Sequence, residues 1–156
     1  MKAEVKEPRR DALWRWIWVV AFAIAFAWVE TSVVVYLREI YFEGSFSFPL
    51  VVHWEEGRHV VDQLVRIEFG REIATMLMLA AVGCVAGRNA LHRFCFFMIA
   101  FGVWDVFYYI WLRVLVGWPQ SLMTWDLLFF VPLPCIHFLG LLTVTFVSSS
   151  CIGSCT

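Results

Sequence analysis

Long apolar stretches alternate with shorter polar segments along this chain of 156 residues. About 20 predominantly apolar residues are needed to cross the hydrocarbon core of a bilayer as a helix. By that measure the pattern predicts transmembrane helices over residues 13–37, 65–87, 91–115 and 127–147. A polar outer loop, residues 38–63, separates the first two. We therefore expect an all-α integral membrane four-helix bundle that forms a single transmembrane domain over residues 1–156.

The fourth predicted helix contains two interior prolines, Pro132 and Pro134. Proline lacks a backbone N–H, and its ring clashes with the carbonyl group four residues earlier. The carbonyl groups of Leu128 and Phe130 would therefore lose their helical hydrogen bonds. In a membrane such a break persists only where protein or water satisfies the backbone. We expect helix four to be kinked or split at these prolines, with Asp126 as its N-cap.

Composition supports a membrane protein and excludes several classes of function. Hydrophobic residues make up 62% of the chain, against about 45–50% in soluble domains. The net charge of −1 offers no basic excess for a nucleic-acid partner, so none is expected. The sequence contains no phosphate-binding loop, no G-x-S-x-G motif and no HExxH motif. This favours a protein that is not an enzyme, with no catalytic residue, metal site or cofactor.

The basic residues predict an orientation, because positively charged flanks favour the cytoplasmic side of a membrane. With the N-terminus inside, seven Lys and Arg residues fall on the inner side and five on the outer side. Five of those seven flank the first helix, which strengthens the bias. We expect both termini in the cytoplasm and a location in the inner (plasma) membrane. The five cysteines would then lie near the inner face or within helix four, so we expect reduced thiols.

Ionisable residues interrupt three of the apolar stretches at positions that should lie within hydrocarbon. Glu30 lies in the first stretch, Glu72 in the second and Asp105 in the third. A charge at this depth costs about 2.5–3.5 kcal/mol on insertion scales, so such residues face a bundle interior, a partner or water. At a rise of about 1.5 Å per residue, all three acids fall in the outer half of the membrane. We expect them to share one polar cavity that is open to the outside.

Helical spacing adds further members to this cluster. Glu68, Arg71, Glu72 and Thr75 follow an i, i+3, i+4, i+7 pattern and share one helix face, which makes Arg71 the expected counter-ion. Tyrosine hydroxyl groups can donate hydrogen bonds to a carboxylate, and two tyrosines share the face of Asp105. The predicted polar intramembrane cluster comprises Glu30, Glu68, Arg71, Glu72, Asp105, Tyr108 and Tyr109. Candidate auxiliary positions are His137, Trp125 and Asp126.

Three functions fit such a cluster. A self-neutralising network would hold helices in register, because unpaired polar groups are unfavourable in hydrocarbon. That favours a non-enzymatic structural protein or a subunit of a complex, in contact with the lipid bilayer and with a membrane-protein partner or a second copy of the chain. A relay through Glu30, Glu72 and Asp105 would instead favour a proton- or ion-coupled small carrier. The acids with His137 would fit a metal-dependent membrane enzyme, although the Glu-x-x-His pattern of di-iron bundles is absent.

One stretch, FGVWDVFYYIWLRVLVGWPQSLMTWDLLFFVPLP at residues 101–134, resembles a segment of uncharacterised small bacterial multi-pass membrane proteins. In that group an FGxWDxFYY motif precedes GWPxSLxTWD and a proline-interrupted last helix. ETSVVVYLRE and GREIATMLMLAAVG are similar to its other helices, so the resemblance covers residues 30–134. The C-terminal VSSSCIGSCT departs from the group's pattern, so we expect the last helix to end differently here. The resemblance implies a multi-pass topology and no activity, and it marks as motif positions Trp104, Asp105, Tyr108, Tyr109, Trp125 and Asp126.

Overall fold

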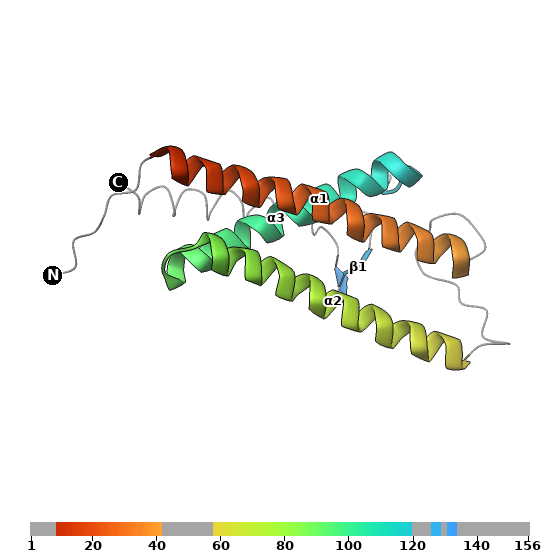
Figure 1. The fold of residues 1–156 in the computed structure, drawn as a ribbon. Coiled ribbons are helices and arrows are strands. Elements are labelled where there is room, and N and C mark those ends of the chain that lie inside the picture. Colours follow the sequence, from red (N-terminus) through yellow and green to blue (C-terminus); the bar gives the residue numbers. More distant parts are fainter. Residues whose placement is uncertain (1–8, 42–57, 120–125, 129–130, 134–156) are drawn as a thin grey trace.

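Three long helices make up most of the described structure, and Figure 1 shows their arrangement. Helix α1 spans Arg9–Tyr41, α2 spans Arg58–Ala86 and α3 spans Ala90–Val116. Residues 38–41 and 58–63 of the predicted outer loop therefore belong to helices α1 and α2. The computed structural model describes residues 9–41, 58–119, 126–128 and 131–133.

Each of these helices contains a stretch that is long and apolar enough to cross a membrane. The stretches are Ala12–Leu37, Val65–Ala86 and Ala90–Val116. At about 1.5 Å per residue they are about 33–40 Å long, against about 30 Å for a bilayer core. They coincide to within one residue with the helices predicted over 13–37, 65–87 and 91–115. The chain is thus a membrane protein whose described residues include three helices able to cross the bilayer.

Helix α3 is the central element, since it packs against both other helices while α1 and α2 contact each other little. In the 18-residue window that marks its membrane stretch 56% of the residues are buried, against 28% in the window of α1 and 17% in that of α2. Trp16 of α1 packs against Phe96 of α3 with ring centroids 5.2 Å apart. Closer to the C-terminal ends of both helices, Trp28 of α1 packs edge-on against Trp111 of α3, with ring centroids 5.0 Å apart. Because the contact positions increase along both helices, α1 and α3 run parallel. Large parts of α1 and α2 remain exposed.

The turn between α2 and α3 is short because its residues suit both helix ends. The side chain of Asn89 caps α3 by accepting a backbone hydrogen bond from its first turn, at 2.8 Å. Two glycines allow the helices to approach closely. A Cβ atom on Gly83 would lie 2.7 Å from the backbone nitrogen of Phe97, and one on Gly87 would lie 2.3 Å from that of Arg93. Both distances are too short for any side chain, so the hairpin depends on glycine here.

Helix α3 ends at Gly117, which adopts a left-handed backbone conformation with φ of 71°. Glycine is favoured in this conformation because it has no Cβ atom. The Gly117 N–H donates to the carbonyl of Arg113 at 3.1 Å. The Arg113 guanidinium in turn donates to the carbonyl oxygens of Gly117 and Pro119, both at 2.8 Å. The cation at this end of α3 is therefore used in capping the helix.

The prediction of a four-helix bundle is wrong. Strand β1 (Asp126–Leu128) pairs antiparallel with β2 (Val131–Leu133), so the described residues of the predicted fourth helix are extended and the described structure has three helices. The physical reason lies in the two prolines. Val131 and Leu133 each precede a proline, and a residue in that position is disfavoured from the helical region and driven towards extended conformations. The remaining residues of the predicted helix, 129–130 and 134–147, lie outside the described residues.

Two other predictions depended on the fourth helix, and one of them concerns the C-terminus, which lies outside the described residues. Asp126 belongs to β1, so it is not the N-cap of a helix. The prediction of a cytoplasmic C-terminus required an even number of spans, which the three described helices do not provide.

The prediction that all cysteines are reduced thiols is also wrong. Cys95 is disulfide-bonded, whereas Cys84 is a free, exposed thiol. The prediction rested on the redox state of a compartment, and a compartment does not determine which two thiols the fold brings together.

Candidate functional site

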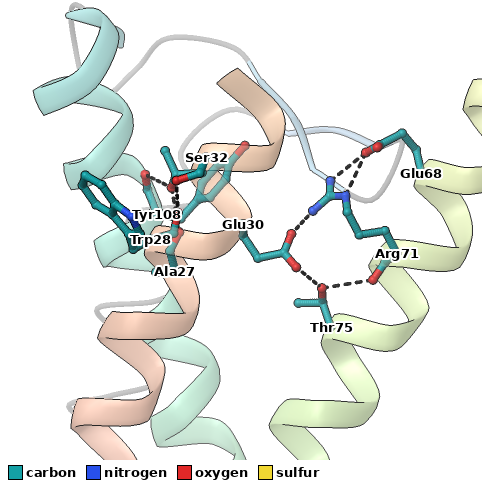
Figure 2. A network of polar contacts seen from close by, with 9 residues as sticks. Ala27, Trp28, Glu30, Ser32, Glu68, Arg71, Thr75 and Tyr108 are labelled. Atoms are coloured by element: carbon teal, nitrogen blue, oxygen red, sulfur yellow. Dashed lines mark hydrogen bonds and ion pairs between the residues drawn. The ribbon is translucent and has the colours of Figure 1, made fainter. Parts of the chain in front are cut away.

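A charged network joins α1 to α2 at membrane depth (Figure 2). Glu30 of α1 points towards α2 and forms an ion pair with Arg71 through its Oε2 atom. The other side of the guanidinium donates two hydrogen bonds to Oε2 of Glu68, from Nε at 3.0 Å and from Nη2 at 2.7 Å. Glu68 lies three residues before Arg71 and thus on the same face of α2. Arg71 is therefore the counter-ion of two carboxylates, one from each helix.

Thr75 completes the network one turn further along α2. Its Oγ1 lies 2.6 Å from Oε1 of Glu30 and 3.0 Å from the backbone carbonyl oxygen of Arg71. A hydroxyl group carries one proton and can serve only one of these acceptors at a time. With Glu30 ionised, the shorter contact is the stronger one, because hydrogen bonds to charged groups are shorter and stronger than neutral ones. Both carboxylate oxygens of Glu30 are thus occupied, which explains how this side chain tolerates an exposure of only 5%.

Helix α3 meets this level of the bundle through Thr31 and Tyr108. The Thr31 hydroxyl lies 2.8 Å from the carbonyl oxygen of Ala27 and 3.2 Å from that of Tyr108. Asp105 is three residues before Tyr108 on α3, about 4.5 Å along the helix axis, and is almost fully buried at 1% exposure. The acids on all three helices therefore lie within about one helical turn of a common level.

The predicted cluster divides into two neighbouring groups. Glu30, Glu68 and Arg71 are in direct contact, as described above. Tyr108 and Tyr109 form a buried aromatic group on α3 beside Asp105, with ring centroids 5.2 Å apart. Trp118, which follows α3, is also buried and packs against Tyr109 with ring centroids 6.4 Å apart. Packing around α3 accounts for that burial, because the aromatic side chains stack along one face of this helix.

Glu72 belongs to the predicted cluster but takes no part in the hydrogen bonds and ion pairs of this network. Its side chain is half-buried and lies close enough to Arg71 to interact electrostatically. Among the described residues it has no hydrogen bond or ion pair of its own. Three carboxylates, those of Glu30, Glu68 and Glu72, thus share the single guanidinium of Arg71. If all are ionised, this part of the bundle carries two more negative charges than positive ones.

Two members of the site were not in the predicted cluster. Thr75 shares the helical stripe of Arg71, so its spacing was a usable signal, but the sequence does not reveal which acid its hydroxyl meets. Thr31 had a weaker signal, its position next to Glu30. Its partner is a backbone carbonyl on another helix, and no sequence pattern marks such an acceptor.

The candidate auxiliary residues contribute no described contact. His137 and Trp125 lie outside the described residues, and Asp126 is placed only by its backbone in β1. Within the described part of the chain, no three His, Cys, Asp or Glu side chains are grouped so that they could hold a metal ion. The described site is therefore a network of one guanidinium, two carboxylates and a threonine hydroxyl, with the carboxylate of Glu72 beside it.

Comparison of the chain with protein-family models, with curated proteins and with solved structures found no match in any of the three.

Proposed function

We propose that this protein is a non-enzymatic subunit of a membrane-protein complex, with α1, α2 and α3 crossing the inner (plasma) membrane and the N-terminus in the cytoplasm. The observation that supports this proposal is the partial exposure of charged side chains inside a membrane stretch. The side chains of Arg71 and Glu68 remain 23% and 20% exposed. Both lie in Val65–Ala86, the least buried of the three stretches.

Charge left facing hydrocarbon is unfavourable by about 2.5–3.5 kcal/mol per residue on insertion scales. The network between Arg71, Glu30 and Glu68 removes part of that cost, because each partner neutralises another. It does not cover the exposed portion of the two α2 side chains. A second protein packed along this face of α2 would exclude lipid from them. The same surface is broad enough for such a contact, since most of α2 is exposed.

The proposal can be tested by photocrosslinking in native membranes. A photoreactive phenylalanine analogue at Phe69, which is 57% exposed and three residues before Glu72, should yield a discrete adduct with one partner protein. The matched control is the same analogue at Leu77, which is 65% exposed and lies about 140° around the helix from Glu72. It should yield lipid adducts only. Lipid adducts alone from both positions would contradict the proposal.

A proton-coupled carrier is the second candidate, favoured by two nearly fully buried carboxyl groups at a similar level, Glu30 at 5% exposure and Asp105 at 1%. A buried carboxyl group can take up and release a proton, as acids in membrane proton relays do. If the subunit proposal holds, the purified protein in sealed vesicles should show no more proton flux than empty vesicles. A flux that Asp105→Asn abolishes, with the helical content unchanged, would instead establish the carrier.

A further inference from the structure

We propose that the membrane-protein partner inserts a Lys or Arg side chain beside Glu72, at the depth of the charged network. This inference rests on the proposed function and specifies the chemistry of the partner. It is carried by the shortage of cations around Glu72.

Glu72 lies deep in the membrane stretch of α2. The midpoint of Val65–Ala86 falls between residues 75 and 76, so Glu72 is about 5 Å from it. Glu30 and Glu68 are satisfied by Arg71, whose guanidinium uses Nη1 for the first and Nε and Nη2 for the second. Glu30 on α1 and Asp105 on α3, which lie within about one helical turn of this level, are acids and supply no cation. Glu72 is therefore the acid of this stretch of α2 that has no ion pair among the described residues.

The basic residues whose side chains the structure describes do not supply this cation. By helix rise, the backbone of Arg38 lies about 12 Å beyond Glu30 and that of Arg58 about 21 Å beyond Glu72. Arg66 is exposed and about 9 Å further out along α2 than Glu72. Arg113 is occupied by two carbonyl oxygens beyond the end of α3. Arg15 donates to the carbonyl oxygen of Ala86 at the opposite end of the bundle.

The residues outside the described structure contain few basic side chains. Residues 42–57 and 120–156 contain no Lys or Arg at all, and residues 1–8 contain only Lys2 and Lys6, which precede the opposite end of α1. Among the remaining bases only the imidazole of His137 lies in a stretch of apolar sequence.

A second copy of the chain is a poor occupant for the same reason. It would present the same excess of carboxylates, and two such faces would repel each other in a medium of low dielectric constant. A transmembrane segment with one ammonium or guanidinium group has the complementary charge. Such pairs are the usual partners of acids within membranes. Charge complementarity thus favours a different protein with a basic residue at membrane depth.

The test uses the full chain in phosphatidylcholine vesicles with synthetic transmembrane probes. The probes are polyleucine helices that carry Lys, Leu or Glu at the central position, and association is measured by energy transfer between labelled protein and peptide. The Lys probe should bind about tenfold more tightly than the Leu probe, as expected for one polar pair within a membrane. The Glu probe should bind no better than the Leu probe. Glu72→Gln should remove the preference, whereas Glu39→Gln, an exposed acid outside the membrane stretch, should retain it.

A charge-reversal variant keeps the test valid if Glu72→Gln folds poorly. Glu72→Lys should transfer the preference to the Glu probe. Equal binding of all three probes, or a Lys preference that survives in Glu72→Gln, would overturn the inference. So would energy transfer between two labelled copies of the chain that exceeds transfer to the Lys probe, because the occupant would then be a second copy.

The crosslinking experiment separates this inference from the proposed function. A protein adduct from Phe69 whose membrane segment has no Lys or Arg would leave the subunit role intact and refute the basic partner residue. Lipid adducts alone would refute the subunit role itself.

Discussion

At the scale of single residues, Arg71 is the point where α1 and α2 are joined. Glu30 has no other cation among the described residues, and its carboxylate is nearly fully buried. Removing one partner of a buried ion pair is much less favourable than replacing both, because a desolvated charge remains. Arg71 and Glu30 should therefore behave as a coupled pair.

We expect Arg71→Gln to lower the free energy of unfolding by about 3 kcal/mol or more, the range for breaking a buried pair. The measurement is denaturant-induced unfolding in mild detergent, followed by the loss of energy transfer between labels on α1 and α2. Arg66→Gln is the matched control, because it makes the same substitution at an exposed position of the same helix. Adding Glu30→Gln to Arg71→Gln should recover part of the loss. Full additivity of the two single variants would contradict the pairing.

Thr75 offers a second test at the same scale. Thr75→Val keeps the shape of the side chain and removes the hydroxyl that lies 2.6 Å from Glu30. We expect a loss of about 1–2 kcal/mol in the same unfolding measurement, within the range for a hydrogen bond to a charged group or within a membrane. Thr75→Ser retains the hydroxyl and should lose less than Thr75→Val. The reverse order would mean that packing of the methyl group matters more than the hydrogen bond.

At the scale of elements, the hairpin of α2 and α3 depends on close contact between the two backbones. Gly83 lies where a Cβ atom would meet the backbone of α3, at 2.7 Å from the Phe97 nitrogen and 2.8 Å from the Arg93 carbonyl oxygen. Backbone atoms cannot move aside as a flexible side chain can. Any side chain at this position must push α2 and α3 apart. That displacement would weaken the packing that holds α2 in place.

Gly83→Ala should therefore destabilise the protein by about 1–3 kcal/mol, the usual cost of overpacking. Gly70→Ala is the matched control on the same helix, since nothing lies within 4 Å of its Cβ position. It should be neutral or slightly stabilising, because alanine is the better helix former. Unfolding in detergent would measure both variants. Equal effects at the two positions would refute the close approach at Gly83.

The strands illustrate a conflict between composition and local backbone preference. Residues 127–147 are apolar enough to predict a helix, but Val131 and Leu133 both precede prolines. The prolines remove two helical donors within three residues and favour extended backbone on their N-terminal sides. At this place backbone chemistry outweighs hydropathy, and a β-pairing of Asp126 with Leu133 results.

At the scale of the whole molecule, the basic residues and the three helices together predict an orientation. Seven Lys and Arg residues lie on the side of the N-terminus, including Arg88 and Arg93 at the turn between α2 and α3. No Lys or Arg follows Arg113, so the bias does not depend on the residues after α3. An odd number of crossings would place Gly117 on the opposite side of the membrane from Arg9.

Reporter fusions would test this orientation. Alkaline phosphatase, which is active only outside the cytoplasm, should be inactive when fused after Arg88 and active when fused after Gly117. A cytoplasmic fluorescent reporter at the same two positions should give the complementary pattern. Phosphatase activity at Arg88, or fluorescence at Gly117, would reverse the proposed orientation.

Much of the fold was readable from the sequence because hydropathy and helix length are local properties. The apolar stretches located three helices to within one residue at each end of their membrane segments. The unusual acids were equally visible, since any charge stands out in such a stretch. Spacing along α2 also identified Arg71 and Glu68 as members of one face, because an i, i+3 pair depends only on helix geometry.

The sequence by itself determined where the chain can cross a membrane and which charges lie at membrane depth. Only the tertiary structure decided which acid meets Arg71, that Thr75 closes the network with Glu30, and that Glu72 has no ion pair among the described residues. Those outcomes depend on how each helix is rotated about its axis and on how closely α3 brings its neighbours together, through Gly83 on one side and Thr31 on the other. Such rotations are set by packing between residues far apart in the chain, and no local pattern records them.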